Sequence, residues 1–228
     1  MKSGMKNMPI EAVIFDMDGV LVDSEVYWLL SREEFARDLG KVWTDADQRL
    51  AMGRNTIEWA EVMRERLHLD WPVETVMADV IARVKAHYDE RMPLRPGALE
   101  AAHLAAEHFR VALASGSPTE IINHVLRLTG LDKIFETVVY GDDMPNGKPA
   151  PDIYLETLRR LGVPAERAVG IEDSGNGIRS LHNAGMWIIA APSPAFPLAP
   201  EVAALAHRQI ASLEDFSVEL VQNITQRL

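Results

Sequence analysis

Three short apolar runs constrain the fold of this chain most strongly. They cover residues 12–15 (AVIF), 110–114 (RVALA) and 168–171 (AVGI), and each is followed by small or polar residues and then by a helical pattern. Runs of this length between helices are typical of strands buried on both faces of a parallel sheet. TVVYG and MWIIAAP are further strand candidates. The sequence therefore predicts an α/β fold with a doubly wound, Rossmann-like parallel sheet, whose ligands bind beyond the carboxyl ends of the strands.

Apolar residues recur at helical spacing in two segments. In residues 119–129, Ile121, Val125 and Leu128 recur at helical intervals before Gly130, which predicts a core-facing helix with a glycine stop. A second apolar stripe at helical spacing precedes residue 70, and we expect it to pack into the core. It consists of Ile57, Ala60, Met63 and Leu67.

Residues 22–92 form a long insertion without a convincing strand pattern, and VETVMADVIARV within it carries one apolar helical face. We therefore expect an all-helical cap domain at 22–92, inserted into an α/β core made of residues 1–21 and 93–228. Its place in the chain puts the cap over the carboxyl end of the first strand, where it could exclude water and select substrates.

The amino-acid composition limits the classes of partner that the protein can bind. The net charge of -11 argues against nucleic acid, which is bound through clustered Lys and Arg. The absence of cysteine excludes disulfides and thiolate metal sites. The first ten residues hold no signal-like apolar stretch, and AGMWIIAAPSPAFPLAP is broken by prolines and falls short of the ~20 residues of a membrane span. We expect a cytoplasmic protein with a small-molecule partner and no membrane; the sequence leaves the oligomeric state open, with a monomer as the expectation.

Chemistry-bearing residues follow the predicted strands. Asp16 and Asp18 come after the first strand, SGSP begins at Ser115 after the second, and EDSGNG begins at Glu172 after a later one. Lys148 stands in NGKPAPD, a loop before another helix. Because parallel strands end at one edge of the sheet, this set offers acids for a hard metal, a hydroxyl with neighbouring amides, and one cation. Phosphoryl transfer needs these groups.

The residues can be given roles on chemical grounds. Asp16, Asp173 and Glu172 could hold Mg²⁺ against a phosphate, while Lys148 and Ser115 neutralise the remaining phosphoryl oxygens. One carboxylate is free to attack phosphorus and form an aspartyl phosphate. A second must carry the proton to the leaving oxygen, which contributes ~10²- to 10⁴-fold to the rate.

DMDGVLVDSE, ASGSP, GKPAPD and GIEDSGNG, in this order, resemble the four motifs of the haloacid dehalogenase superfamily, in its phosphatase branch with a helical (C1-type) cap. The resemblance implies that Asp16 is the nucleophile and Asp18 the general acid/base. It also implies phosphate binding by Ser115, Gly116 and Lys148.

The same resemblance implies a set of Mg²⁺ ligands. They are Asp16, the backbone carbonyl of Asp18, Asp173, and Glu172 either directly or through water. Relatives that cleave carbon–halogen bonds lack an acid at the place of Asp18, because a halide leaves without a proton. Dehalogenase activity is therefore disfavoured.

The pattern is similar to that of sugar-phosphate phosphatases and of beta-phosphoglucomutases. The mutases carry a histidine in the first cap helix where Trp28 stands here, which weakens the mutase interpretation. We predict a Mg²⁺-dependent phosphomonoester hydrolase acting on a small phosphorylated metabolite, with a sugar phosphate favoured. Alternatives are a phosphosugar mutase and a non-catalytic protein that binds a phosphorylated ligand or a partner. Glu25, Trp28 and Arg54 are the cap residues expected near the substrate.

Overall fold

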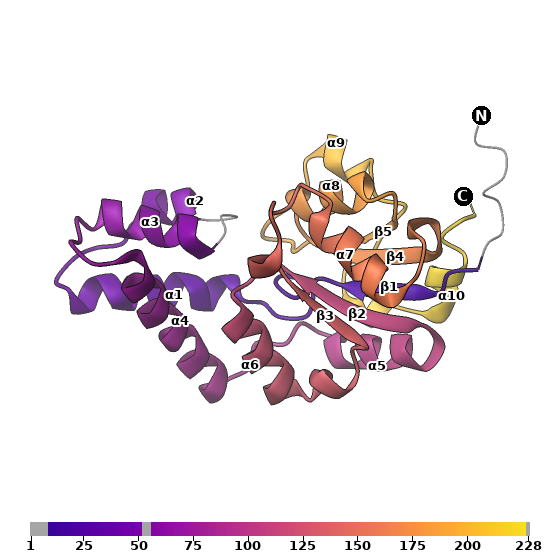
Figure 1. Ribbon diagram of the computed structural model, residues 1–228, viewed down its shortest axis with the longest axis horizontal. Coiled ribbons are helices and arrows are strands. Elements are labelled where there is room, and N and C mark those ends of the chain that lie inside the picture. Colours follow the sequence, from indigo (N-terminus) through magenta and orange to yellow (C-terminus); the bar gives the residue numbers. More distant parts are fainter. Residues whose placement is uncertain (1–8, 52–55, 227–228) are drawn as a thin grey trace.

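The computed structural model describes residues 9–51 and 56–226, and within them one sheet of six parallel strands has the order β3-β2-β1-β4-β5-β6 (Figure 1). The strands are β1 Ala12–Phe15, β2 Arg110–Ser115, β3 Thr137–Tyr140, β4 Ala168–Glu172, β5 Trp187–Ala190 and β6 Arg208–Gln209. The first strand lies between β2 and β4, so the strand order reverses beside it and a crevice opens beyond its carboxyl end. The predicted doubly wound α/β fold is confirmed, and the five predicted strands are present.

Helices cover both faces of the sheet (Figure 1). One face carries α5 Ala98–His108, α6 Thr119–Thr129 and α10 Val218–Gln222, and the other carries α7 Asp152–Leu161, α8 Gly175–Asn183 and the short α9 Pro200–Ala203. Val13 and Phe15 of β1 pack into the first layer, whereas Ala12 and Ile14 pack into the second. Side chains of a strand alternate between faces, so a strand buried on both sides must be apolar throughout, as this one is.

In the described part of the chain, four helices lie beyond the sheet and pack on one another (Figure 1). These cap helices are α1 Glu25–Asp38, α2 Asp45–Ala51, α3 Thr56–Arg66 and α4 Val73–Glu90. The buried residues of α4 recur at helical spacing, and they are Val76, Val80, Ile81, Val84 and Tyr88. The C-terminal part of α4 packs against α6. This contact joins the cap helices to the core.

The chain enters and leaves the cap helices at one place. The backbone N–H of Asp23 donates to the Pro93 carbonyl at 2.8 Å, and the N–H of Arg95 donates to the Leu21 carbonyl at 2.9 Å. These bonds lie at the proposed domain boundary. The division into a core of residues 1–21 and 93–228 and a cap of residues 22–92 itself stays a prediction.

Two of the predicted stripe positions are wrong. Leu128 is 46% exposed, because the buried side of α6 is centred on Ile121, Ile122, Val125 and Leu126 and leaves Leu128 at its flank. Ile57 is 59% exposed, because the buried side of α3 is set by Thr56, Trp59, Ala60 and Met63. Both helices nevertheless form where the apolar spacing indicated.

None of the helices in the described part of the chain combines the length and the apolar character needed to cross a bilayer.

Candidate active site

The register of the central strands positions the first aspartate. Phe15 at the end of β1 pairs on both sides, with β2 and with β4. The next residue, Asp16, therefore lies level with Ala114 on one side and Glu172 on the other, and its N–H donates to the carbonyl of Ile171 at 3.1 Å. The carboxyl ends of three strands thus deliver the side chains of one site.

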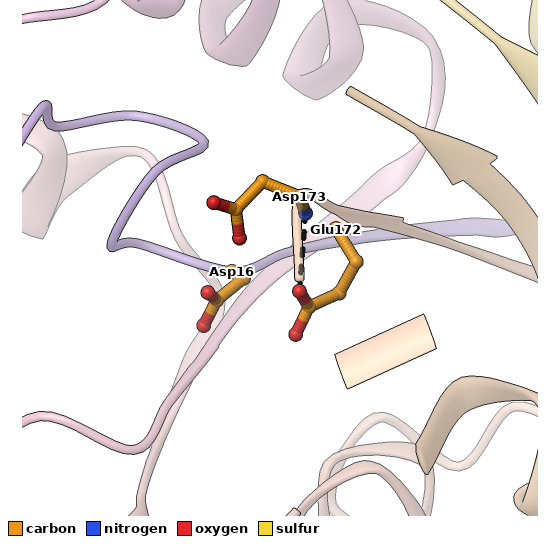
Figure 2. A group of neighbouring side chains, drawn as sticks. All are labelled: Asp16, Glu172 and Asp173. Carbon is orange, nitrogen blue, oxygen red and sulfur yellow. Dashed lines mark hydrogen bonds between the residues drawn. The ribbon is translucent and has the colours of Figure 1, made fainter. Parts of the chain in front are cut away.

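Three carboxylates meet at this edge, those of Asp16, Glu172 and Asp173 (Figure 2). One oxygen of each lies within 4.8 Å of the others. Asp16 is 6% exposed and Glu172 is 0% exposed. Buried like charges at this separation are unfavourable unless cations offset them, so the arrangement requires positive charge.

Glycine is required beside two of these acids. Gly19 has φ +74°, and a Cβ there would lie 1.9 Å from Oδ2 of Asp173. A Cβ at Gly177 would lie 1.8 Å from the carboxylate of Glu172. The glycines in DMDG and SGNG therefore leave the space that the acids occupy.

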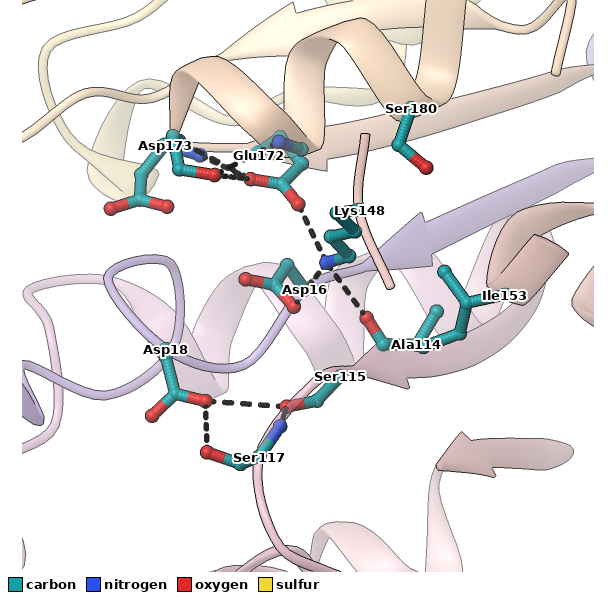
Figure 3. A network of polar contacts seen from close by, with 12 residues as sticks. Asp16, Asp18, Ala114, Ser115, Ser117, Lys148, Ile153, Glu172, Asp173 and Ser180 are labelled. Atoms are coloured by element: carbon teal, nitrogen blue, oxygen red, sulfur yellow. Dashed lines mark hydrogen bonds and ion pairs between the residues drawn. The ribbon is translucent and has the colours of Figure 1, made fainter. Parts of the chain in front are cut away.

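Lys148 supplies a cation at the centre of the site (Figure 3). Its Nζ donates to Oδ1 of Asp16 at 2.8 Å and to Oε1 of Glu172 at 2.7 Å, and it lies 3.4 Å from the Ala114 carbonyl. Burial alone would lower the pKa of Lys148, but Asp16 and Glu172 raise it well above its ordinary value. The side chain is held as an ammonium ion.

Glu172 is fixed by hydrogen bonds to both of its oxygens. Besides Lys148, Oε1 accepts from the Tyr154 hydroxyl at 2.9 Å. Oε2 accepts from the backbone N–H groups of Asp173 and Ser174, at 3.1 and 3.2 Å, and from the Ser174 hydroxyl at 3.1 Å. With its lone pairs engaged in this way, Glu172 is suited to orient a metal through water more than to ligate it directly.

Asp16 and Asp173 keep the character of metal ligands. Burial raises the pKa of Asp16 well above its usual value, with Lys148 opposing and the neighbouring carboxylates adding to the rise. Burial and the charge of Glu172 raise the pKa of Asp173 from 3.8 to about 7. One ammonium therefore does not satisfy the three acids, and a hard divalent cation with oxygen ligands fits the remaining charge.

Asp18 stands apart from this cluster and points to the second strand end (Figure 3). Its Oδ2 accepts from the Ser117 hydroxyl at 2.7 Å and from the Ser115 hydroxyl at 3.2 Å. Its Oδ1 is buried without a hydrogen-bond partner among the described residues. An acid with one oxygen anchored and the other unpaired is placed to exchange a proton with a bound ligand.

A cavity of about 830 Å³ lies over these groups, a size typical of small-molecule sites. Its wall includes five core residues and two cap residues predicted for the site: Asp16, Asp18, Gly116, Lys148, Asp173, Glu25 and Trp28. Ser115 and Glu172 lie directly behind the wall, both 0% exposed. Arg54 lies outside the described residues. The structure thus brings the predicted core residues together, and their individual roles stay predictions.

Sequence reasoning missed two residues of the core site. Ser117 belongs to the SGSP segment, and its place two residues after Ser115 puts its hydroxyl beside Asp18. Tyr154 is fully buried under Lys148, with the Nζ 5.0 Å from its ring centroid. An aromatic residue six positions after Lys148 in a helix reads as ordinary core, and only its hydroxyl contact reveals the second role.

Comparison with known proteins gives concordant results. The sequence profile of the haloacid dehalogenase-like hydrolases matches residues 10–185. A phosphorylated carbohydrates phosphatase of Thermotoga maritima is 35% identical over 78% of this chain and 82% of its own. Hexitol phosphatase B of Escherichia coli is 32% identical over 92% of this chain and 96% of its own.

Comparison with solved structures gives the same family as comparison of the sequences. CbbY from Rhodobacter sphaeroides, solved in complex with phosphate, has a TM-score of 0.79 at 29% identity over 90% of this chain and 96% of its own. Similarity in fold, sequence and strand-end motifs, extending over most of the chain, shows that the protein belongs to the haloacid dehalogenase-like hydrolases and confirms the family predicted from its four motifs.

Proposed function

We propose that the protein is a Mg²⁺-dependent phosphatase that hydrolyses the phosphomonoester of a small sugar phosphate through a phosphorylated Asp16. The observation that carries the proposal is the convergence of Asp16, Asp18 and Lys148 on one cavity, with a third acidic group, Asp173, beside them. The two relatives described above are named for phosphorylated carbohydrates and for hexitol phosphate, which supports the substrate class.

In the first step, a carboxylate oxygen of Asp16 forms a bond to phosphorus while the bond from phosphorus to the ester oxygen breaks. Asp18 gives its proton to the departing oxygen, so the sugar leaves as a neutral alcohol. Lys148, together with the Ser115 hydroxyl and the Gly116 N–H, holds the phosphoryl oxygens. Lys148 already lies 2.8 Å from Asp16, so the nucleophile and its electrostatic support are in place before a substrate binds.

In the second step, Asp18 is a carboxylate and takes a proton from water. The water oxygen bonds to phosphorus, the bond from phosphorus to Asp16 breaks, and inorganic phosphate leaves. We assign both proton transfers to Oδ1 of Asp18, because this oxygen has no hydrogen-bond partner among the described residues whereas Oδ2 accepts from two hydroxyls.

The metal would be held by Asp16, Asp173 and the backbone carbonyl of Asp18, with Glu172 acting through water. Bound Mg²⁺ supplies neutralisation of the phosphoryl charge and of the crowded carboxylates, which is worth several kcal/mol in sites of this kind. The fit rests on three carboxylate oxygens within 4.8 Å of one another, which the Lys148 ammonium only partly balances.

The test is phosphate release from a panel of hexose, pentose and hexitol phosphates, with Mg²⁺ and with EDTA. We expect turnover of at least one member with Mg²⁺ and its loss with EDTA. A mutase would instead interconvert isomers after priming by a bisphosphate and release little phosphate. A binding protein would hold a ligand without turnover, unchanged by Asp18→Ala, and either result contradicts the proposal.

A further inference from the structure

The cap side of the cavity contains a buried arginine between two aromatic rings. Arg32 of α1 is 5% exposed, and its guanidinium carbon lies 5.3 Å from the ring centroid of Trp28 and 5.3 Å from that of Trp59. All three residues belong to the wall of the cavity. Cation–π contacts of this kind hold a guanidinium in one orientation while leaving its N–H groups available at the edge of the plane.

A side-chain amide links this arginine to an acid. Arg32 Nη1 donates to Oε1 of Gln48 at 3.2 Å, and Gln48 Nε2 donates to Oε1 of Glu25 at 2.8 Å. Oε1 of Gln48 also accepts from the indole of Trp43 at 2.9 Å, which fixes the orientation of the amide. Glu25 and Arg32 are thereby held at fixed positions on the cavity wall.

Arg32 has hydrogen-bonding capacity to spare. Its Nε is buried and has no hydrogen-bond partner among the described residues. Burial lowers the pKa of Arg32 to about 10, so the group is charged at neutral pH. Leaving a buried charged donor unpaired is unfavourable, and a bound ligand with an acceptor oxygen would relieve that cost.

We infer that Arg32 and Glu25 form a subsite that binds the hydroxyl groups of the leaving group, with Arg32 as the specificity-determining residue. The inference rests on the proposed phosphatase function and extends it. The pair offers a donor and an acceptor, which matches neighbouring hydroxyls, and its net charge is zero. Because Glu25, held beside it through Gln48, offsets the charge of Arg32, the subsite selects a neutral polyhydroxylated group over one with a carboxylate or a second phosphate.

The first experiment compares two substrates. A hexitol or hexose phosphate has hydroxyls for Arg32, whereas p-nitrophenyl phosphate has none in its leaving group. We expect Arg32→Met to lower kcat/KM for the sugar phosphate about 10- to 100-fold, mainly through KM, because hydrogen bonds to a charged group are lost. Turnover of p-nitrophenyl phosphate should stay within about threefold, which also shows that the variant is folded.

A matched control lies on the same helix. Arg37 of α1 has a side chain that is 69% exposed, and it is not part of the cavity wall. Arg37→Met should leave both substrates unchanged. Equal losses for both substrates in Arg32→Met would indicate a structural role and overturn the inference, as would no loss for either.

The second experiment tests the charge balance. Glu25→Gln leaves the positive charge of Arg32 unopposed, so the activity ratio of phosphoglycolate to sugar phosphate should rise at least about tenfold. An unchanged ratio would overturn the inference while the phosphatase proposal stands. Failure of the wild-type protein to release phosphate from any of these substrates would overturn the proposed function and this inference with it.

Discussion

The two walls of the cavity are built on different principles. On the core side, ionised groups follow parallel strands and lie against one another, as Lys148 does between Asp16 and Glu172. On the cap side, the Arg32 guanidinium lies between two aromatic rings, and the neutral amide of Gln48 links it to Glu25. In the function proposed above, the core wall receives the phosphoryl group, which every substrate shares, and the cap wall faces the part of the substrate that differs. Chemistry should therefore depend on the core wall and selectivity on the cap wall.

The largest effect is expected for Asp16→Asn. Loss of the nucleophile should lower kcat by about 10⁴-fold or more, and by the same factor for a sugar phosphate and for p-nitrophenyl phosphate. Phosphate release from both substrates measures this directly. Asp45→Asn, at an exposed position of α2, serves as the control and should retain full activity. Substrate-dependent loss in Asp16→Asn would break the division between the two walls.

A smaller and more selective loss is expected for Asp18→Asn. Sugar phosphates should lose ~10²- to 10⁴-fold in kcat, because an alkoxide cannot leave readily without a proton. p-Nitrophenolate leaves without one, so a rapid burst of product should persist while the later attack of water is slow. Stopped-flow absorbance at the absorption maximum of p-nitrophenolate would reveal the burst. Loss of the burst together with steady turnover would assign Asp18 to a role other than proton transfer.

Gly19→Ala tests how tightly the core wall is packed. The left-handed backbone at Gly19 costs a residue with a Cβ about 1–2 kcal/mol, and the new methyl group would meet Oδ2 of Asp173 at 1.9 Å. We expect a lower melting temperature and a higher Mg²⁺ concentration for half-maximal activity. Gly40→Ala is a matched control, since Gly40 has φ +68° and no atom within 4 Å of its Cβ position. It should share the backbone strain and keep the Mg²⁺ requirement of the wild type.

The smallest effect concerns pH. Burial and Glu172 raise the pKa of Asp173 to about 7, so the metal-free folded protein binds a proton there more tightly than the unfolded chain does. The stability that this proton provides is complete below the ordinary carboxyl pKa and is lost as the pH rises through about 7. Mg²⁺ can replace the proton, so the rise in melting temperature on adding Mg²⁺ should be larger at about pH 8 than at about pH 6, by ~2–4 °C. Thermal melts measure the difference, and Asp173→Asn should abolish it.

The core could be predicted from the sequence because its signals are local. A short apolar run followed by a carboxylate, as in residues 12–16, indicates both a buried strand and a functional group at its end. Strand β6 was missed because Arg208–Gln209 is too short to show any alternation. Ser117 was named only as part of its motif, since a serine two residues beyond the strand is equally suited to a helix start.

The cap wall could not be predicted in the same way, because its contacts cross between helices. Arg32 stands four residues after Trp28, and this spacing alone places the two on one side of α1. The second ring comes from Trp59 of α3 and the amide from Gln48 of α2, and no periodicity in the sequence indicates that these helices converge. A charged residue in a helix also reads as exposed, whereas Arg32 is buried.

The paired backbone bonds where the chain departs toward α1 and returns after α4 have an evolutionary consequence. The Asp23 and Arg95 amides hold the outgoing and returning segments side by side. The connection to the sheet is therefore closed by these hydrogen bonds, and it does not depend on which helices are inserted between the two segments. A helical insert of another length or shape could be exchanged at this point without altering a single strand pairing. The same catalytic core could in this way carry inserted domains of many different shapes.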